Sequence, residues 1–347
     1  MEKIRIAFIG TGGMGQKAHL SQYAVLPQCE VVAIAEARSD LAEAVARRYA
    51  VPRYFTNHRE LLDKVDADGY VCIQQYRNHL ALLPDIFTRG KPVLTEKPLA
   101  LSVEAGEKLV ALAARHSAIH MVGNHKRSDP AMEYAKKLTE EWKASGKYGR
   151  MKYIRITMPP GDWISGAAAS LGSRQPYPAI DSEPLIISGM TEDESKEYNT
   201  FVNYYIHQVN ALRYLLGEPY RVTFADRSGV LMGCESVSGV PAILEMAPWS
   251  NRVLWLETYL VCFEHGTVQV ELPPPLAAQR AGKVTVMKDA GEDACFESPI
   301  LPNLSAMRNQ AMNFLKVIAG EALPPCDGPE ALEDLRNAME YIQLRHR

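Results

Sequence analysis

Three glycines near the N-terminus have the spacing of a phosphate-binding turn. The segment from Gly10 to Gly15, GTGGMG, fits G-x-G-x-x-G and stands between the apolar run at residues 4–9 and a helix-like segment. In such a unit the first glycine permits the tight turn, the second admits a pyrophosphate, and the third lets helix and strand pack closely. Helix N-terminal amides favour the anion. The pattern predicts a dinucleotide site that includes Gly12, Gly13 and Met14.

A carboxylate stands about 20 residues after the glycines, at the end of the second apolar run. Glu36 is placed to accept hydrogen bonds from the adenosine ribose hydroxyls and to repel a 2′-phosphate. This favours NAD over NADP, although Arg38 leaves use of both open.

Two further segments carry residues suited to proton transfer. Glu96-Lys97-Pro98 follows the fifth apolar run, and NYYIHQVN, residues 203–210, contains His207. Lysine and histidine can both act as acid or base near neutral pH when their surroundings allow it. Asn203 and His207 are four residues apart and would share one face of a continuous helix, so that both could address one substrate.

The elements around these residues follow two patterns. Up to residue 122, short β-rich runs alternate with helical segments, which predicts a parallel sheet covered on both faces. Longer strand candidates follow, among them a hairpin that turns near residues 264–267, and two helices close the chain. We therefore expect a nucleotide-binding domain at 1–122 and an α+β domain at 123–347, with the closing helices packing back on the first domain. We expect residues 159–198 to form a long, lid-like binding segment.

Composition excludes several classes of function. The chain of 347 residues is 47% hydrophobic and 23% charged, with a formal net charge of −3, so it shows neither a nucleic-acid stripe nor a polybasic membrane patch. Six dispersed cysteines form no CxxC pair, which predicts free thiols and no metal site. No apolar run reaches the roughly 18 residues of a membrane span, so we expect a cytoplasmic protein.

Several motifs, in order, resemble the Gfo/Idh/MocA family of oxidoreductases (glucose–fructose oxidoreductase, inositol dehydrogenase and rhizopine catabolism). They are Glu96-Lys97-Pro98, the preceding His79, GNHKRSDP at 123–130, SGKYGRMKYIRI at 145–156 and IHQVNALRYLLGEP at 206–219. The resemblance implies an N-terminal Rossmann domain with a doubly wound parallel sheet. It also implies a C-terminal α+β domain with a large, mostly antiparallel sheet, which pairs into a homodimer or homotetramer.

The resemblance also implies roles for individual residues. Glu96 would approach the nicotinamide ribose, and Lys97 the substrate hydroxyl as well as the cofactor. Gln74 and His79 would face the cofactor, although many relatives have Thr-Pro where this chain has Gln74-Gln75. The expected substrate-facing residues are Arg127, Trp163, Tyr177, Asn203, Tyr204 and His207.

One family motif is altered. The family's Asp-x-x-x-His-x-x-Asp reads here as Asn203, His207 and Asn210, and an amide cannot take a proton as a carboxylate does. We therefore expect His207 and Lys97 to carry proton transfer, with Tyr204 as a further candidate. Tyr204 and His207 loosely match the Tyr-x-x-His of family members that cleave glycosides with a retained NAD+.

The leading hypothesis is a dehydrogenase that transfers hydride between a sugar or polyol hydroxyl and NAD. The alternative is an NAD+-dependent glycosidase that works by transient oxidation at C3, elimination, hydration and reduction. A non-catalytic NAD-sensing regulator is a third reading, disfavoured by the presence of Lys97 and His207.

Overall fold

The computed structural model describes residues 2–246, 254–291 and 294–347, which form two compact units. Unit 1 comprises Met1–Asn124, Ala167–Thr191 and Gln310–Leu335, and unit 2 comprises His125–Gly166, Glu192–Asn309 and Arg336–Arg347. Unit 1 therefore contains most of the expected nucleotide-binding domain, much of the lid-like segment and parts of both C-terminal helices. The chain passes from one unit to the other several times.

Unit 1 is built on a six-stranded parallel sheet in the order β3-β2-β1-β4-β5-β6. Its strands are β1 (Ile4–Ile9), β2 (Cys29–Ala35), β3 (Tyr54–Phe55), β4 (Gly69–Cys72), β5 (Val93–Glu96) and β6 (His120–Gly123). The strand order reverses between β1 and β4, the point at which sheets of this class bind ligands at their carboxyl ends. The predicted doubly wound Rossmann sheet is confirmed.

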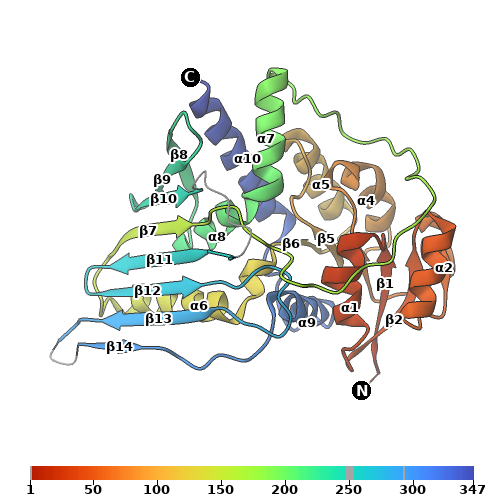
Figure 1. The fold of residues 1–347 in the computed structure, drawn as a ribbon, viewed down its shortest axis with the longest axis horizontal. Helices are drawn as coiled ribbons and strands as arrows, with labels where there is room; N and C mark the ends of the chain where they lie inside the picture. The colour runs from red at the N-terminus through yellow and green to blue at the C-terminus, as the bar shows by residue number, and fades with distance from the viewer. Residues whose placement is uncertain (1, 247–253, 292–293) are drawn as a thin grey trace. The chain divides into compact units, whose positions relative to one another are not determined.

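Helices connect these strands (Figure 1). They are the π-helical turn η1 (Gly15–Leu20), α1 (Ser21–Tyr23), α2 (Ser39–Arg48), α3 (His58–Lys64), the 3-10 turn η2 (Tyr76–Asn78), α4 (His79–Phe87) and α5 (Val103–Arg115). Late in the chain, α9 (Ala306–Ile318) contributes the fully buried Phe314 to the apolar core that contains Ile6 and Phe8. The core of unit 1 thus draws on both ends of the sequence.

Unit 2 is built on an eight-stranded sheet in the order β14-β13-β12-β11-β7-β10-β9-β8. Its strands are β7 (Met151–Thr157), β8 (Tyr220–Ala225), β9 (Leu231–Ser236), β10 (Pro241–Glu245), β11 (Thr258–Phe263), β12 (Gly266–Glu271), β13 (Lys283–Lys288) and β14 (Cys295–Glu297). Only the β7–β10 pair is parallel among the described pairings, which confirms the mostly antiparallel sheet. Side chains alternate between buried and more exposed along β9 and β11, as expected for a sheet with one covered face.

Helix α6 (Pro130–Ser145) covers β12 and β13 (Figure 1). The Asp129 side chain caps its start by accepting a hydrogen bond from the Ala131 amide at 2.9 Å, and Pro130 occupies the first turn. Gly146 ends the helix with φ at +64°, a conformation that glycine adopts at little cost. The turn before α6, η3 (His125–Ser128), is thereby held in a defined position.

The expected continuous helix across residues 203–210 is wrong. Helix α7 (Glu192–Tyr204) ends and α8 (Ile206–Leu216) begins on either side of Tyr205. The Tyr205 hydroxyl donates to the Met246 carbonyl at 3.1 Å, and the Tyr205 carbonyl accepts from the Gln208 amide at 2.9 Å, so a new first turn starts there. Asn203 is consequently exposed while His207 is buried. The remaining helix, α10 (Gly328–Arg345), closes the chain.

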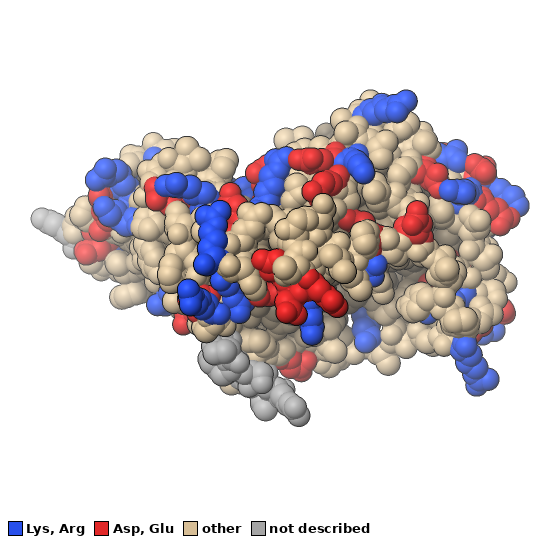
Figure 2. Space-filling view, turned by 90° about the horizontal axis from the view of Figure 1, so that it is seen from above, with Lys and Arg blue, Asp and Glu red and all other residues tan. Residues whose placement is uncertain are grey.

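Charged side chains of both signs are intermingled on the face shown in Figure 2. None of the helices in the described parts of the chain has the length and apolar character needed to cross a bilayer.

Candidate active site: a dinucleotide cradle and a buried polar layer

The glycine turn of unit 1 has the geometry of a dinucleotide cradle. Gly10 has φ at +93°, and a Cβ there would collide with the Ile73 carbonyl oxygen, so no other residue fits. A Cβ on Gly15 would lie 2.6 Å from the Gly10 carbonyl oxygen, because η1 starts directly against β1. Two of the three glycines are therefore required by packing alone.

The backbone between these glycines is not covered by core side chains. A Cβ on Gly12 would meet only the Tyr177 hydroxyl at 3.4 Å and Arg38 Nη2 at 3.8 Å, and one on Gly13 only Ser170 Oγ at 3.8 Å, within 4 Å. The segment thus presents bare backbone beside polar side chains, which fits the approach of a pyrophosphate.

Glu36 is buried at the end of β2 and accepts three hydrogen bonds. The Thr11 amide donates to Oε2 at 3.2 Å, and Arg38 donates its amide at 3.3 Å and its Nε at 2.7 Å to Oε1. A carboxylate has about four acceptor positions, so capacity remains for a ribose hydroxyl. Both side chains are more than nine-tenths buried. Arg38 is consequently held as an ion-pair partner of Glu36.

Glu96 is held at the end of β5 by His19, a residue that the sequence analysis missed. The His19 Nε2 to Glu96 Oε1 distance is 2.6 Å, and the Lys97 amide donates to Oε2 at 3.2 Å. Burial raises the pKa of Glu96, but the hydrogen bond and charge of His19 and the charge of Lys97 outweigh it, so the pKa lies below its usual value. The Lys97 side chain is half-buried, and the Lys97-Pro98 peptide bond is cis.

The expected cofactor contact of His79 is replaced by a structural one. Its side chain is fully buried, and Nδ1 donates to the Leu99 carbonyl at 2.8 Å, just after the Glu96-Lys97-Pro98 turn. His79 therefore holds this turn and presents no surface to a ligand. Gln74, by contrast, lies against Gly10 in the glycine turn, next to the cradle.

Acid is expected to weaken unit 1 through His79. Burial lowers its pKa from 6.5 to about 4, so between these values the unfolded chain binds the proton and the folded chain does not. This contribution to stability is complete above about pH 6.5 and is lost as the pH falls toward 4, at most about 3 kcal/mol in total. Urea unfolding at pH 7.5 and 5.0 should show a larger loss for the wild type than for His79→Gln. Equal losses in the two proteins would contradict this account.

In unit 2, two consecutive residues of η3 contact α8 and Glu257, the residue just before β11. The His125 and His207 rings meet edge to face with centroids 4.5 Å apart. Lys126 forms an ion pair with Glu257, whose other oxygen accepts from Gln208 Nε2 at 2.6 Å. These five side chains are nearly or fully buried. They form a polar layer that fixes the position and the surroundings of His207.

Glu257 is the centre of this layer. Besides Lys126 and Gln208, it accepts hydrogen bonds from Trp255 Nε1 at 3.1 Å and from the Tyr259 hydroxyl. The sequence offers no signal for this role, because Glu257 looks like one acidic residue before an apolar strand.

We expected Arg127 to face a substrate. In the structure its side chain is buried against α8. Its Nε donates to Asn210 Oδ1 at 2.6 Å, its guanidinium lies over the Tyr214 ring at 4.9 Å, and the side chain is 3% exposed. It holds η3 against α8. The amide oxygen of Asn210 is the acceptor in this contact, a role that a carboxylate could also fill.

The other expected substrate residues fall in different units. Tyr204 and Trp163 belong to unit 2, where the Tyr204 hydroxyl accepts from the Gly161 amide at 3.3 Å and the Trp163 side chain is 39% exposed. Burial, partly offset by that hydrogen bond, raises the pKa of Tyr204. Tyr177 belongs to unit 1 and lies over Arg38, beside the glycine turn, rather than with the residues of unit 2.

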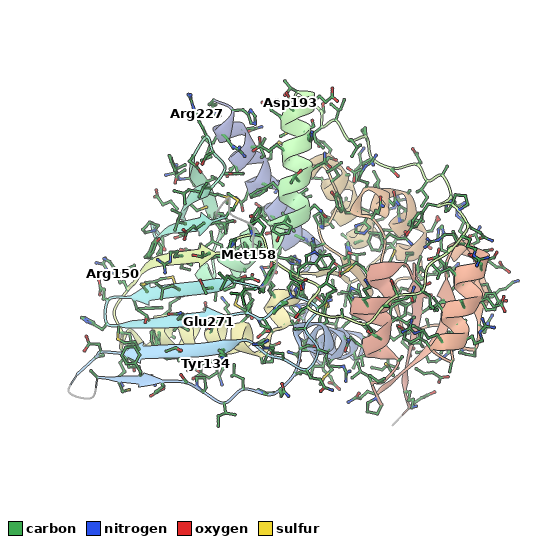
Figure 3. The ribbon with its side chains drawn as sticks, viewed as in Figure 1. Tyr134, Arg150, Met158, Asp193, Arg227 and Glu271 are labelled. Carbon is green, nitrogen blue, oxygen red and sulfur yellow. The ribbon has the colours of Figure 1, made fainter. Side chains whose placement is uncertain are left out.

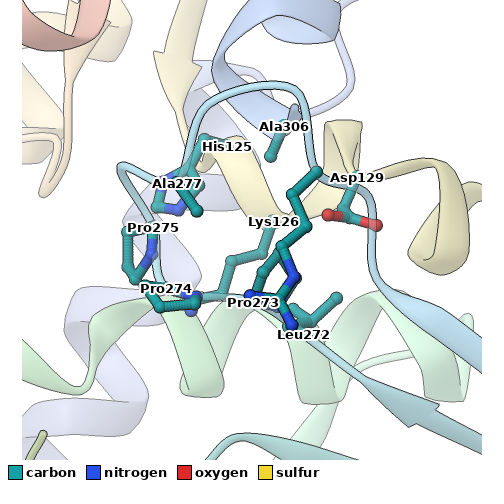
Figure 4. A pocket seen from close by; sticks show the side chains of 10 residues that line it. His125, Lys126, Asp129, Leu272, Pro273, Pro274, Pro275, Ala277 and Ala306 are labelled. Carbon is teal, nitrogen blue, oxygen red and sulfur yellow. The ribbon is translucent and has the colours of Figure 1, made fainter. Parts of the chain in front are cut away.

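A polar pocket opens beside the buried layer of unit 2 (Figure 4). His125, Lys126 and Asp129 line one side, and the loop of Pro273, Pro274 and Pro275 lines another. His125 thus lines this pocket and also contacts His207, which is not itself among the lining residues.

Comparisons with known proteins agree with this geometry. Over 254 residues, 69% of this chain and 62% of the relative, the sequence is 28% identical to levoglucosan dehydrogenase of Pseudarthrobacter phenanthrenivorans. It is 23% identical to myo-inositol 2-dehydrogenase of Thermotoga maritima over 65% of this chain and 58% of that protein. The match thus spans about three fifths of the length of these curated relatives.

The fold is shared with solved structures over almost the whole chain. Aldose-aldose oxidoreductase from Caulobacter crescentus superposes with a TM-score of 0.71 at 18% identity, covering 99% of this chain and 98% of that one. Residues 4–124 match the model of the Gfo/Idh/MocA oxidoreductase family, described by its NAD-binding Rossmann fold. The glycine turn, Glu36 and Glu96-Lys97-Pro98 all lie within that match, so residues 4–124 resemble the NAD-binding Rossmann domain of that family.

Proposed function

We propose that this protein is a dehydrogenase that uses NAD in preference to NADP and acts on a hydroxyl of a sugar or polyol. The observation that carries the proposal is the glycine cradle with the buried Glu36 beside it. The names of the relatives, levoglucosan dehydrogenase and myo-inositol 2-dehydrogenase, support a small carbohydrate or polyol as substrate.

The preference for NAD follows from the arrangement at the end of β2. The Glu36 carboxylate can accept from ribose hydroxyls, whereas it would repel a 2′-phosphate. Arg38 could attract that phosphate, but its Nε and its amide both donate to Glu36. A 2′-phosphate near Arg38 would therefore also lie close to the Glu36 carboxylate, which would repel it.

Each candidate residue has a role that its surroundings support. When bound, the nicotinamide supplies the hydride acceptor. Glu96, held by His19, would orient the nicotinamide ribose, and the half-buried Lys97 would take or return the proton of the substrate hydroxyl. His207, positioned by His125, would assist in binding that hydroxyl or relaying its proton.

A redox-neutral glycosidase is the second candidate, and Tyr204 favours it. Its side chain is half-buried, and its hydroxyl, which accepts from the Gly161 amide at 3.3 Å, keeps an O–H that could donate a proton to a leaving group. Tyr204 also stands three residues before His207, although the break at Tyr205 separates their helices.

A single assay distinguishes the two activities. The enzyme is mixed with NAD+ or NADP+ and a panel of free sugars, polyols, levoglucosan and nitrophenyl glycosides, while NADH and nitrophenol are read together. Formation of NADH with a free sugar or polyol is the expected result. Release of nitrophenol without net NADH, lost when bound NAD+ is removed, would assign the glycosidase activity instead.

The resemblance to the family also supports a homodimer or homotetramer, which light scattering coupled to size-exclusion chromatography would measure.

A further inference from the structure

One segment of the lid-like region belongs to unit 1 and is held there along its length. We call residues 167–191 the arm. In Figure 3, Met158 marks the end of β7, where the chain leaves the sheet of unit 2, and Asp193 marks the first turn of α7, where it returns. Between these points the arm makes side-chain contacts with four separate parts of the Rossmann unit.

The first half of the arm is tied to the glycine turn and to α2. The buried Gln16 side chain, in η1, donates to the Leu171 carbonyl at 3.0 Å and accepts from the Leu171 amide at 2.8 Å. Asp40, in α2, accepts from Ser173 Oγ at 2.5 Å and from the Arg174 amide at 3.0 Å. The arm is therefore anchored immediately after both β1 and β2.

The second half is anchored after β4 and β5. Ser182 Oγ donates to Asn78 Oδ1 at 2.5 Å. The Glu183 carboxylate accepts from the Leu101 and Ser102 amides, both at 3.0 Å, and from Ser102 Oγ at 2.7 Å. All four anchor points thus follow the carboxyl ends of parallel strands, the edge at which a dinucleotide binds.

Tyr177 lies between these anchors and faces the cradle. Its ring stacks on the Arg38 guanidinium, with Cζ 3.9 Å from the ring centroid, and its hydroxyl is 3.4 Å from the position of a Cβ on Gly12. Arg38 Nη2 lies at the same place, 3.8 Å from that Cβ, with the Tyr177 side chain as its polar neighbour, and it donates no hydrogen bond of ordinary geometry to a described residue. Arg38 is 93% buried, so this open donor is an independent sign of an anionic or hydroxylated ligand beside Gly12.

We propose that the arm is the outer wall of the dinucleotide site, with the Tyr177 hydroxyl and Arg38 Nη2 contacting the adenosine half of the bound cofactor. This deepens the proposed function and rests on it. Since the arm crosses the open edge of the site, the dinucleotide enters and leaves only when the arm detaches. Tyr177 is then a cofactor-binding residue of a segment outside the Rossmann sequence match, which ends at residue 124.

The test measures NADH dissociation by stopped-flow fluorescence, together with the Kd for NAD+ by calorimetry, on the full chain. Tyr177→Ala is expected to raise the dissociation rate by about 10-fold or more, and Tyr177→Phe by less, because the ring still packs on Arg38. Tyr177 is 69% exposed, so neither change should affect folding. Ile186→Ala, at an exposed position of the same arm, is the matched control and should leave the rate unchanged.

Trypsin provides a readout independent of activity. Arg174 is exposed in the arm and is followed by Gln175, so cleavage there reports detachment of the segment. NAD+ should slow this cleavage several-fold in the wild type and less in Tyr177→Ala. Wild-type protein that binds no dinucleotide would overturn the proposed function and the arm proposal together. Wild-type protein that binds NAD+, with no change in dissociation or cleavage in Tyr177→Ala, would overturn the arm proposal alone.

Discussion

Replacing Lys97 by alanine is expected to lower kcat by about 10²- to 10⁴-fold, the usual contribution of a positioned acid–base group. In the proposed role, the half-buried Lys97 side chain accepts the proton of the substrate hydroxyl as a neutral amine, and its removal takes that acceptor away. Binding of NAD+ should weaken by less than about 10-fold, because the glycine cradle and Glu36 are unchanged. Steady-state kinetics and calorimetry on the same preparation separate the two effects.

The matched control is Lys91→Ala. Lys91 is an exposed lysine six residues earlier, just before β5, and its removal should leave kcat within about twofold of the wild type. If Lys97→Ala retained more than about a tenth of the wild-type kcat with the preferred substrate, the proposed role of Lys97 would be wrong.

Glu257→Gln is expected to destabilise unit 2 by about 3–5 kcal/mol, since it leaves the buried Lys126 charge without its partner. The amide keeps the shape of the side chain but has one oxygen where the carboxylate offers two to Trp255, Gln208 and Tyr259. The unfolding midpoint in urea, followed by tryptophan fluorescence, reports the loss.

A double variant separates charge burial from general damage. Lys126→Met with Glu257→Gln removes both charges and should be more stable than Glu257→Gln alone. Glu235→Gln removes the acidic partner of the exposed Arg221 and should cost less than about 1 kcal/mol. A Glu257→Gln midpoint equal to that of Glu235→Gln would show that the buried pair contributes little.

The parallel sheet of unit 1 was predictable because its signals are local. A short apolar run marks each strand, and Gly10 and Gly15 are required by contacts within the first strand–turn–helix unit. The presence of a mostly antiparallel sheet was also predictable, and so was the hairpin of β11 and β12.

The polar contacts were not predictable because their partners are distant in sequence. His19 and Glu96 are 77 residues apart, and Lys126 and Glu257 are 131 apart. The run HKRSD consists of polar and charged residues, yet His125, Lys126 and Arg127 are buried against partners that no local pattern indicates. The contact of Tyr177 with Arg38 was not predictable for the same reason, since an aromatic residue in a long loop carries no sign of the surface on which it packs.

The course of the chain through unit 1 has a consequence for synthesis on the ribosome. Phe314, Leu315 and Val317 fill the same core as Ile6 and Phe8, and the Val122 amide donates to the Cys326 carbonyl beside the last strand of the sheet. Domains usually fold from the N-terminus as they emerge. Here the nascent sheet lacks part of its core until residues 310–335 have left the exit tunnel, long after the six strands themselves have emerged. Until these residues pack on it, the apolar face of the sheet is exposed, and chaperones can bind to it.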